Sequence, residues 1–270
     1  MSNTVDNLFI TKWQEEVSHK FQQTESRLRS SVTVATGVGE SFSFPRMEAA
    51  TSQKNKARHA DLVSANIQSD RVPLTISTYH AVEYIDDLDT VRTNVDLRNS
   101  YTKALMARIN RDVDSEIIAA LSATSNTALS LSNTLNKAGL VSVGKTFLLN
   151  EIHPDGQLTI AVSPGGQEDI LSDTTLTSRD YIEKGLLEEG YAKGVMGWNL
   201  VTSTLLDSDT NGKTNNYFFH KDAVGIGFAK DVTMSVDWIA HKDAWQVMAK
   251  VACGAVIIRP EGVQYAEIDN

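Results

Sequence analysis

The sequence predicts an α+β protein, and three observations support that fold class. Residues 31–80 form a long extended arm, residues 96–123 form one unbroken helix, and the chain from residue 216 onward is rich in strands. With 270 residues, of which 41% are hydrophobic, the chain can bury one large core or two modest ones. We therefore expect a globular protein rather than a disordered one.

A candidate amphipathic helix covers residues 5–28. Trp13, Val17 and Phe21 lie four residues apart and form a narrow apolar stripe on an otherwise polar helix. A stripe of this kind buries itself against another surface, so we expect this N-terminal segment to pack on something outside itself.

The arm that follows consists of two alternating segments and a long polar connection. Apolar residues recur at every second position in residues 32–44 and again in residues 71–78. Two strands alone are marginal in water, and the polar residues 47–70 between them far exceed the usual hairpin loop of about 2 to 5 residues. We expect the arm to lie across another copy of the chain, because it cannot bury its own hydrophobic side.

The long helix is predicted over residues 96–123, with Asp96 as its N-cap. Its apolar residues recur every fourth position, so the stripe winds around the helix instead of staying on one face. The polar stretch at residues 122–136 predicts a boundary or a surface loop.

The second half of the chain alternates helices and strands. We expect a helix over residues 138–153, a strand near residue 160, a turn at Ser163–Gln167, and a short helix followed by a strand before residue 205. Four strand-like segments make up the tail, with breaks at Gly254 and Pro260.

Charge and cysteine content narrow the classes of function. The net charge of −9 argues against tight binding of a phosphate backbone. The first 80 residues are nearly neutral and locally basic at Lys54, Lys56 and Arg58, so the arm could dock on the acidic body of a neighbour or be an ordinary solvated loop. The single cysteine, Cys253, excludes an intrachain disulfide and fits a reducing cytoplasm. We find no signal peptide and no stretch able to span a bilayer.

One motif indicates an enzyme. Gly139 to Thr146 satisfies G-x-x-x-x-G-K-[ST], in which backbone N–H groups wrap phosphates and the lysine, here Lys145, reaches them. The motif should follow a buried parallel strand, but here it follows the polar sequence NTLNKA. We therefore expect the start of a surface helix, with a phosphate-loop nucleotide-binding protein as the distant alternative.

Other sites are weaker still. Residues 207–212 match only the first half of a calcium loop, because Phe218 stands where a bidentate Glu is needed, and a plain turn is expected. The six histidines show no metal-binding spacing, and no G-x-S-x-G elbow is present. We expect no catalytic residue, no metal and no cofactor.

The order of these parts resembles that of the major capsid proteins of tailed bacteriophages with the Hong-Kong-97-type fold. The residues that carry the resemblance are NVDLRNSYTKALMARINRDVDSEIIAAL for the spine helix, LNEIHPDGQLTIAVSP and GYAKGVMGWNLVTST for the axial domain, and the closing HKDAVGIGFAKDVTMSVDW and ACGAVIIRPEGVQYAEI. It spans nearly the whole chain and rests on diffuse patterning rather than on one motif.

The resemblance implies a division of the chain. It predicts an N-terminal arm (1–35), an extended β-hairpin loop (36–80), a peripheral domain with the spine helix (81–137), an axial α+β domain (138–240), and strands that return to the peripheral domain (241–270).

The resemblance also implies function. It predicts a structural protein without an active site, which self-assembles into hexamers and pentamers of an icosahedral phage head around double-stranded DNA. Such a protein would assemble in the cytoplasm of the host bacterium and reside in the virion. Its other partners would be a separate scaffolding protein, a portal and decoration proteins, with no sequence-specific DNA binding and no membrane. The close alternative is an encapsulin-like compartment shell protein.

The same resemblance assigns contacts between subunits to two groups of side chains. From the N-terminal arm these are Trp13, Val17 and Phe21; from the extended loop they are Phe42, Phe44, Arg46, Lys54, Lys56, Arg58, Arg71, Leu74 and Ile76.

Overall fold

The computed structural model describes residues 23–37, 39, 41–59, 61–62, 64–87, 97–128, 134–177, 194–206 and 213–269. The chain forms two compact units, each assembled from three stretches of sequence. Unit 1 comprises Met1–Glu25, Tyr79–Arg111 and Val232–Val251, and unit 2 comprises Ser26–Thr78, Asp112–Asp231 and Ala252–Asn270.

The long helix is the clearest success of the sequence prediction. α2 runs over Leu97–Ser122, within one residue of the predicted bounds at each end. Of its apolar stripe, Ile109, Val113, Ile117 and Leu121 are fully buried, whereas Tyr101 near the N-terminus is exposed. The predicted N-cap, Asp96, lies outside the described residues.

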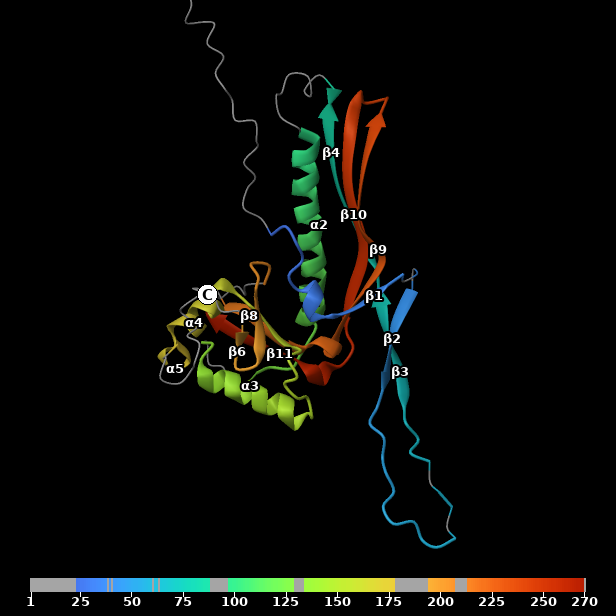
Figure 1. The fold of residues 1–270 in the computed structure, drawn as a ribbon, viewed down its shortest axis with the longest axis vertical. Helices are drawn as coiled ribbons and strands as arrows, with labels where there is room; N and C mark the ends of the chain where they lie inside the picture. The colour runs from blue at the N-terminus through green and yellow to red at the C-terminus, as the bar shows by residue number, and fades with distance from the viewer. Residues whose placement is uncertain are drawn as a thin grey trace, which may run out of the picture. The chain divides into compact units, whose positions relative to one another are not determined.

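A five-stranded sheet forms the core of unit 2, in the order β11-β8-β5-β7-β6. The strands are β5 (Leu158–Val162), β6 (Gly194–Val195), β7 (Trp198–Thr202), β8 (Lys213–His220) and β11 (Val263–Asp269). β5 is buried along its whole length and pairs parallel with β7 and antiparallel with β8. Figure 1 shows α3 (Lys137–Leu149), α4 (Pro164–Ser172) and α5 (Thr174–Thr177) around this sheet.

Aromatic stacking ties α3 to the sheet. The ring of Trp198 lies 5.2 Å from that of Phe147 and 5.5 Å from that of Phe218, both edge to face. Such contacts add to the hydrophobic term from burying these large side chains. The strand predicted near residue 160 is confirmed by β5, and the helix predicted at residues 138–153 is confirmed by α3, although α3 ends at Leu149 and residues 150–153 are not helical.

A second sheet has four strands in the order β1-β9-β10-β4. Its strands are β1 (Thr33–Thr36), β4 (Ser77–Asp86), β9 (Val224–Ile239) and β10 (Ala244–Ile257). β1 pairs parallel with the first residues of β9, in the register Thr33↔Gly225 to Thr36↔Phe228. The first part of the predicted arm is thus a sheet strand rather than part of the hairpin.

Two local predictions were wrong. Ser163–Gln167 is not a turn, because Ser163 caps α4 by accepting a hydrogen bond from the Gly166 N–H (3.1 Å) and Pro164 occupies the first helical turn. Gly254 does not break a strand, since β10 runs through it; Pro260 does, and begins the short helix η5 (Pro260–Gly262). The loop predicted at residues 122–136 is present: among its described residues, 123–127 are exposed or half-buried, whereas Ala128 and Leu135 are buried.

Residues 23–28 are not helical, contrary to the predicted helix over residues 5–28. Instead, the buried carboxylate of Asp114 on α2 holds this segment. It accepts hydrogen bonds from the Ser26 hydroxyl and from the backbone N–H groups of Arg27 (3.1 Å) and Leu28 (3.2 Å). The next residues form the short helix η2 (Arg29–Ser31). Trp13, Val17 and Phe21 lie outside the described residues.

A histidine contact beside the turn η4 (Lys221–Ala223) predicts a small dependence of stability on pH. The His220 ring lies 3.3 Å from an Asp155 carboxylate oxygen, and this hydrogen bond lowers the pKa of Asp155 below its usual 3.8. Because the pKa of Asp155 is lower in the folded than in the unfolded state, its carboxylate stabilises the fold at pH values above the unfolded-state pKa. This stabilisation is lost as the pH falls through the folded-state pKa. We expect Asp155→Asn to lower the midpoint of urea denaturation at pH 6, and only slightly because Asp155 is exposed. The effect should be smaller at pH 3, where the carboxylate becomes protonated. An equal loss at both pH values would contradict this account.

Candidate assembly interface at the arm hairpin

The arm hairpin consists of β2 (Ser41–Met47), β3 (Ser69–Thr75) and the connection at residues 48–68 (Figure 1). The strands are antiparallel, from Ser41↔Thr75 to Met47↔Ser69, and the Glu48 N–H continues the ladder by donating to the Gln68 carbonyl oxygen (3.0 Å). The predicted two-stranded arm is present. Every described residue of the connection is exposed, including Lys54, Lys56 and Arg58.

The root of the arm hairpin is buried in its own chain, which corrects the expectation that the arm cannot bury its hydrophobic side. Phe44 and Leu74 are 6% and 5% exposed and form a cluster with Ile258, which follows β10. Phe42 packs edge to face on Phe44, with ring centroids 5.0 Å apart, and Ile76 also lies against the cluster. These four predicted contact residues therefore have an identified role within the subunit.

Two glycines make room for this root. A Cβ on Gly225 of β9 would lie 2.6 Å from the Phe44 ring and 2.9 Å from the Ile258 Cδ1 atom, and a Cβ on Gly254 of β10 would overlap the carbonyl oxygen of Thr75. Strand glycines often mark such close approaches. The contact at Gly254 lies at Thr75, the last residue of β3, just before β4 begins at Ser77.

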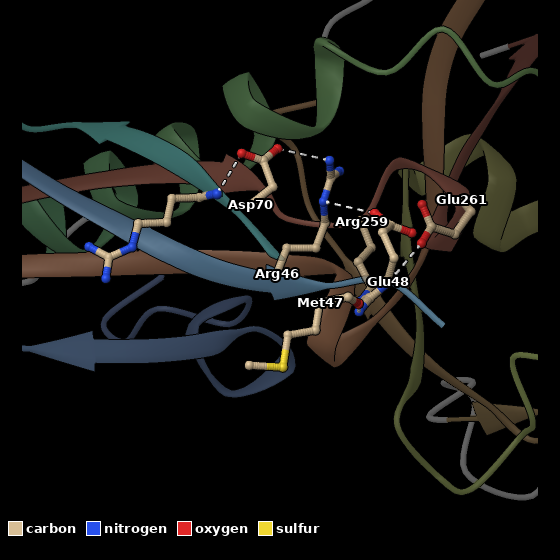
Figure 2. Close-up of polar contacts among 7 residues, drawn as sticks. Arg46, Met47, Glu48, Asp70, Arg259 and Glu261 are labelled. Atoms are coloured by element: carbon tan, nitrogen blue, oxygen red, sulfur yellow. Dashed lines mark hydrogen bonds and ion pairs between the residues drawn. The ribbon is translucent and has the colours of Figure 1, made fainter. Parts of the chain in front are cut away.

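Charged groups line the side of the arm hairpin, as Figure 2 shows. The Arg46 guanidinium lies 3.1 Å from an Asp70 carboxylate oxygen across the hairpin and 3.6 Å from one of Glu48. Such partly exposed pairs contribute little stability, about 0 to 1 kcal/mol. Arg46 thus links the two strands of its own arm, whereas the side chain of Arg71 is exposed.

The arm hairpin is also tied to the end of β10. Arg259 donates a hydrogen bond of 2.7 Å to the Met47 carbonyl oxygen and lies 3.3 Å from a Glu261 carboxylate oxygen. Sequence reasoning missed Arg259, Ile258 and the two glycines as arm residues. Only the glycines carried a signal, because an isolated glycine inside a strand pattern indicates close backbone approach.

The packing at the arm root predicts that removing the Phe44 side chain lowers stability measurably. Phe44→Ala is expected to lower the free energy of unfolding by about 3 kcal/mol, at the low end for a buried Phe because the cluster is small. Urea denaturation measures this loss. Met47→Ala, on the same strand but 64% exposed, is the matched control and should stay within about 0.5 kcal/mol of wild type. Equal losses in the two variants would show that the root contributes no packing energy.

The phosphate-loop alternative fails on geometry. All residues from Gly139 to Thr146 lie inside α3, and the Asn136 side chain caps the helix by accepting from the Gly139 N–H (2.8 Å). Most of these N–H groups form helical hydrogen bonds and cannot wrap phosphates. Within the described residues no cluster of three or more His, Cys, Asp or Glu side chains could hold a metal ion. Residues 207–212 lie outside the described part of the chain.

Among the described helices, none has the length and apolar character needed to cross a membrane. No curated protein sequence matches the chain. A family model described as phage capsid protein matches residues 5–269.

Solved phage structures share the fold. The capsid of cyanophage P-SCSP1u is 18% identical, with a TM-score of 0.75, and the match covers 100% of this chain and 96% of that one. A Mycobacterium phage Che8 chain is 18% identical with a TM-score of 0.76, covering 97% of both chains. The capsid of a native GTA particle is 12% identical with a TM-score of 0.74, covering 99% and 98%. The mixed α+β fold predicted from the sequence is confirmed by these matches.

Proposed function

The chain belongs to the phage capsid protein family, as a major capsid protein of the virion, and we propose that many copies of it close into an icosahedral shell of hexamers and pentamers around double-stranded DNA. The observation that carries the proposal is the arm hairpin. Its connection projects apolar side chains into solvent, with Leu62 80% and Ile67 52% exposed. Exposed apolar groups on an extended element favour burial against a partner, and in a capsid protein that partner is another copy.

The charge of the chain favours the same arrangement. Lys54, Lys56 and Arg58 are exposed near the end of the arm hairpin, while the chain as a whole carries a charge of −9. Opposite charges on two surfaces guide their register and speed their encounter. Specific interfaces bury about 1,200 to 2,000 Å², and repetition over a closed shell makes modest contacts collectively strong.

We extend the proposal to the Hong-Kong-97-type division of the chain. The extended loop at residues 36–80 is supported by the strand pair β2 and β3, and the peripheral domain at residues 81–137 by α2. The axial domain at residues 138–240 supplies four of the five strands of the sheet in unit 2, whereas β11 comes from residues 241–270. The N-terminal arm, residues 1–35, with Trp13, Val17 and Phe21, stays a prediction.

The container role explains the acidic composition. A wall that carries net negative charge does not grip DNA phosphates, so packaged DNA can be pumped in and released. We propose that the protein has no catalytic activity, that it assembles in the host cytoplasm, and that scaffolding, portal and decoration proteins are separate chains.

Negative-stain electron microscopy tests the proposal. The purified chain is imaged after expression alone and after expression with its genomic neighbours. Closed shells, tubes or hexameric rings are expected, at least with the neighbours present. Uniform small particles under both conditions would overturn the proposed assembly.

A further inference from the structure

An apolar groove lies beside α3. Its volume is about 430 Å³, and it lies between α3 and the turn that joins β6 to β7. Val141, Leu148 and Met196 are each 50% exposed there, and Leu149 is 72% exposed. Trp198 forms part of the lining. We call this feature the α3 groove.

Met196 is held at the rim of the α3 groove in a conformation that its residue type disfavours. Its φ is +52°, and that of the next residue, Gly197, is +85°. Two positive φ values make a hairpin turn in which Asn or Asp normally precedes Gly, and a bulky residue in the left-handed region costs about 1 to 2 kcal/mol. Local rules are most often broken where a side chain serves a function. An exposed Met suits a contact surface, because its flexible side chain adapts to a partner.

Lys145 is the one charged residue that lines the α3 groove. Its side chain is exposed, and it forms no ion pair among the described residues. A partner that fills the α3 groove must therefore bring apolar side chains together with a carboxylate, since covering Lys145 without a counter-charge would be unfavourable.

Two hydrogen bonds link the end of α3 to the arm hairpin through the short helix η5 and the residue before it. At one end of η5, Arg259 donates to the Met47 carbonyl oxygen of the arm hairpin (2.7 Å), as Figure 2 shows. Asn150, which follows α3, donates to the carbonyl oxygen of Glu261, the middle residue of η5 (3.2 Å). Exposed Met47 accepts the first of these hydrogen bonds, and exposed Leu149 directly precedes the donor of the second.

We propose that the α3 groove is a docking surface for a second copy of this chain. The inference rests on the proposed function, because only a shell of identical copies supplies this neighbour at every position. The contact is heterologous: the α3 groove of one copy meets a different surface of the next, which lets rings close. An acidic chain supplies the carboxylates that Lys145 requires.

Thiol labelling in assembled particles tests the occupant. Met196→Cys places a reactive thiol at the rim, and wild type provides the background, since Cys253 is fully buried and burial raises the pKa of its thiol to about 12. A maleimide dye is expected to label the free subunit at least tenfold faster than purified shells. Equal rates in the two forms would overturn the inference while the proposed function stood. Protection found only in particles that contain a second protein would also overturn it.

A pair of variants on one helix gives the second test. Leu148→Lys adds a charge inside the α3 groove, whereas Thr146→Lys adds the same charge at an exposed position of α3 that does not line it. Both subunits should fold with the circular dichroism of wild type. The yield of shells is expected to fall at least tenfold for Leu148→Lys only. Equal yields would overturn the inference, and failure of the wild-type chain to assemble would overturn the proposed function with it.

Discussion

Replacing residues 49–67 by Asn-Gly is expected to give a folded subunit that forms no shells. Glu48 and Gln68 already pair at the end of the ladder, so a two-residue turn joins them without changing the register. The described residues that are removed are all exposed, and the buried root with Phe44 stays. Thermal unfolding should therefore change by only a few degrees, whereas electron microscopy should show no closed particles.

A second variant separates the length of the connection from the chemistry of its side chains. Replacing residues 49–67 by an equally long Gly/Ser segment keeps its reach but removes Leu62 and the basic residues. It is also expected to fail to assemble, because the proposed contact depends on side chains. Normal shells from the Asn-Gly variant would refute the role given to the arm, and normal shells from the Gly/Ser variant alone would show that only its length matters.

Gly254→Ala adds only one methyl group, but we expect it to destabilise the fold strongly. The new Cβ would overlap the carbonyl oxygen of Thr75, so the backbone must move at the point where β3 gives way to β4. Forced overpacking costs about 1 to 3 kcal/mol and more where backbone is involved. We expect a loss of about 3 kcal/mol and a melting temperature about 10 °C lower, measured by calorimetry.

The control is the same change at a glycine with free space. A Cβ on Gly144 of α3 meets nothing within 4 Å, so Gly144→Ala should stabilise the subunit by about 0.5 to 1 kcal/mol through helix propensity. If both alanine variants melted at the wild-type temperature, the close contact at Thr75 would have no energetic weight.

The sequence predicted the elements whose signals are local. α2 and α3 were found because a long periodic stretch repeats the same information many times. β2 and β3 were found because alternation marks both strands and only one antiparallel pairing connects them. The α4 helix could have been found as well, since Ser163 and Pro164 are a helix-start signal that was instead interpreted as a turn.

The parts that were missed depend on residues far apart in the chain. β1 pairs with residues 225–228, and the cluster at the arm root joins Phe44 to Ile258. No local pattern near Phe44 indicates that its partner lies more than 200 residues later. No local pattern indicates the α3 groove either, because its two walls come from separate parts of the chain, α3 and the turn at Met196.

The order in which these residues are synthesised delays the packing of the arm hairpin. The strands of the arm hairpin leave the ribosome well before Gly225 and Ile258, against which Phe44 packs, and before β11, which completes the sheet; Ile258 follows Phe44 by 214 residues. At about 5 to 20 residues per second, that interval lasts roughly 10 to 40 s. During that interval a nascent chain carries an arm hairpin whose root has no packing partners, so Phe44 and Leu74 are exposed until Ile258 has been synthesised.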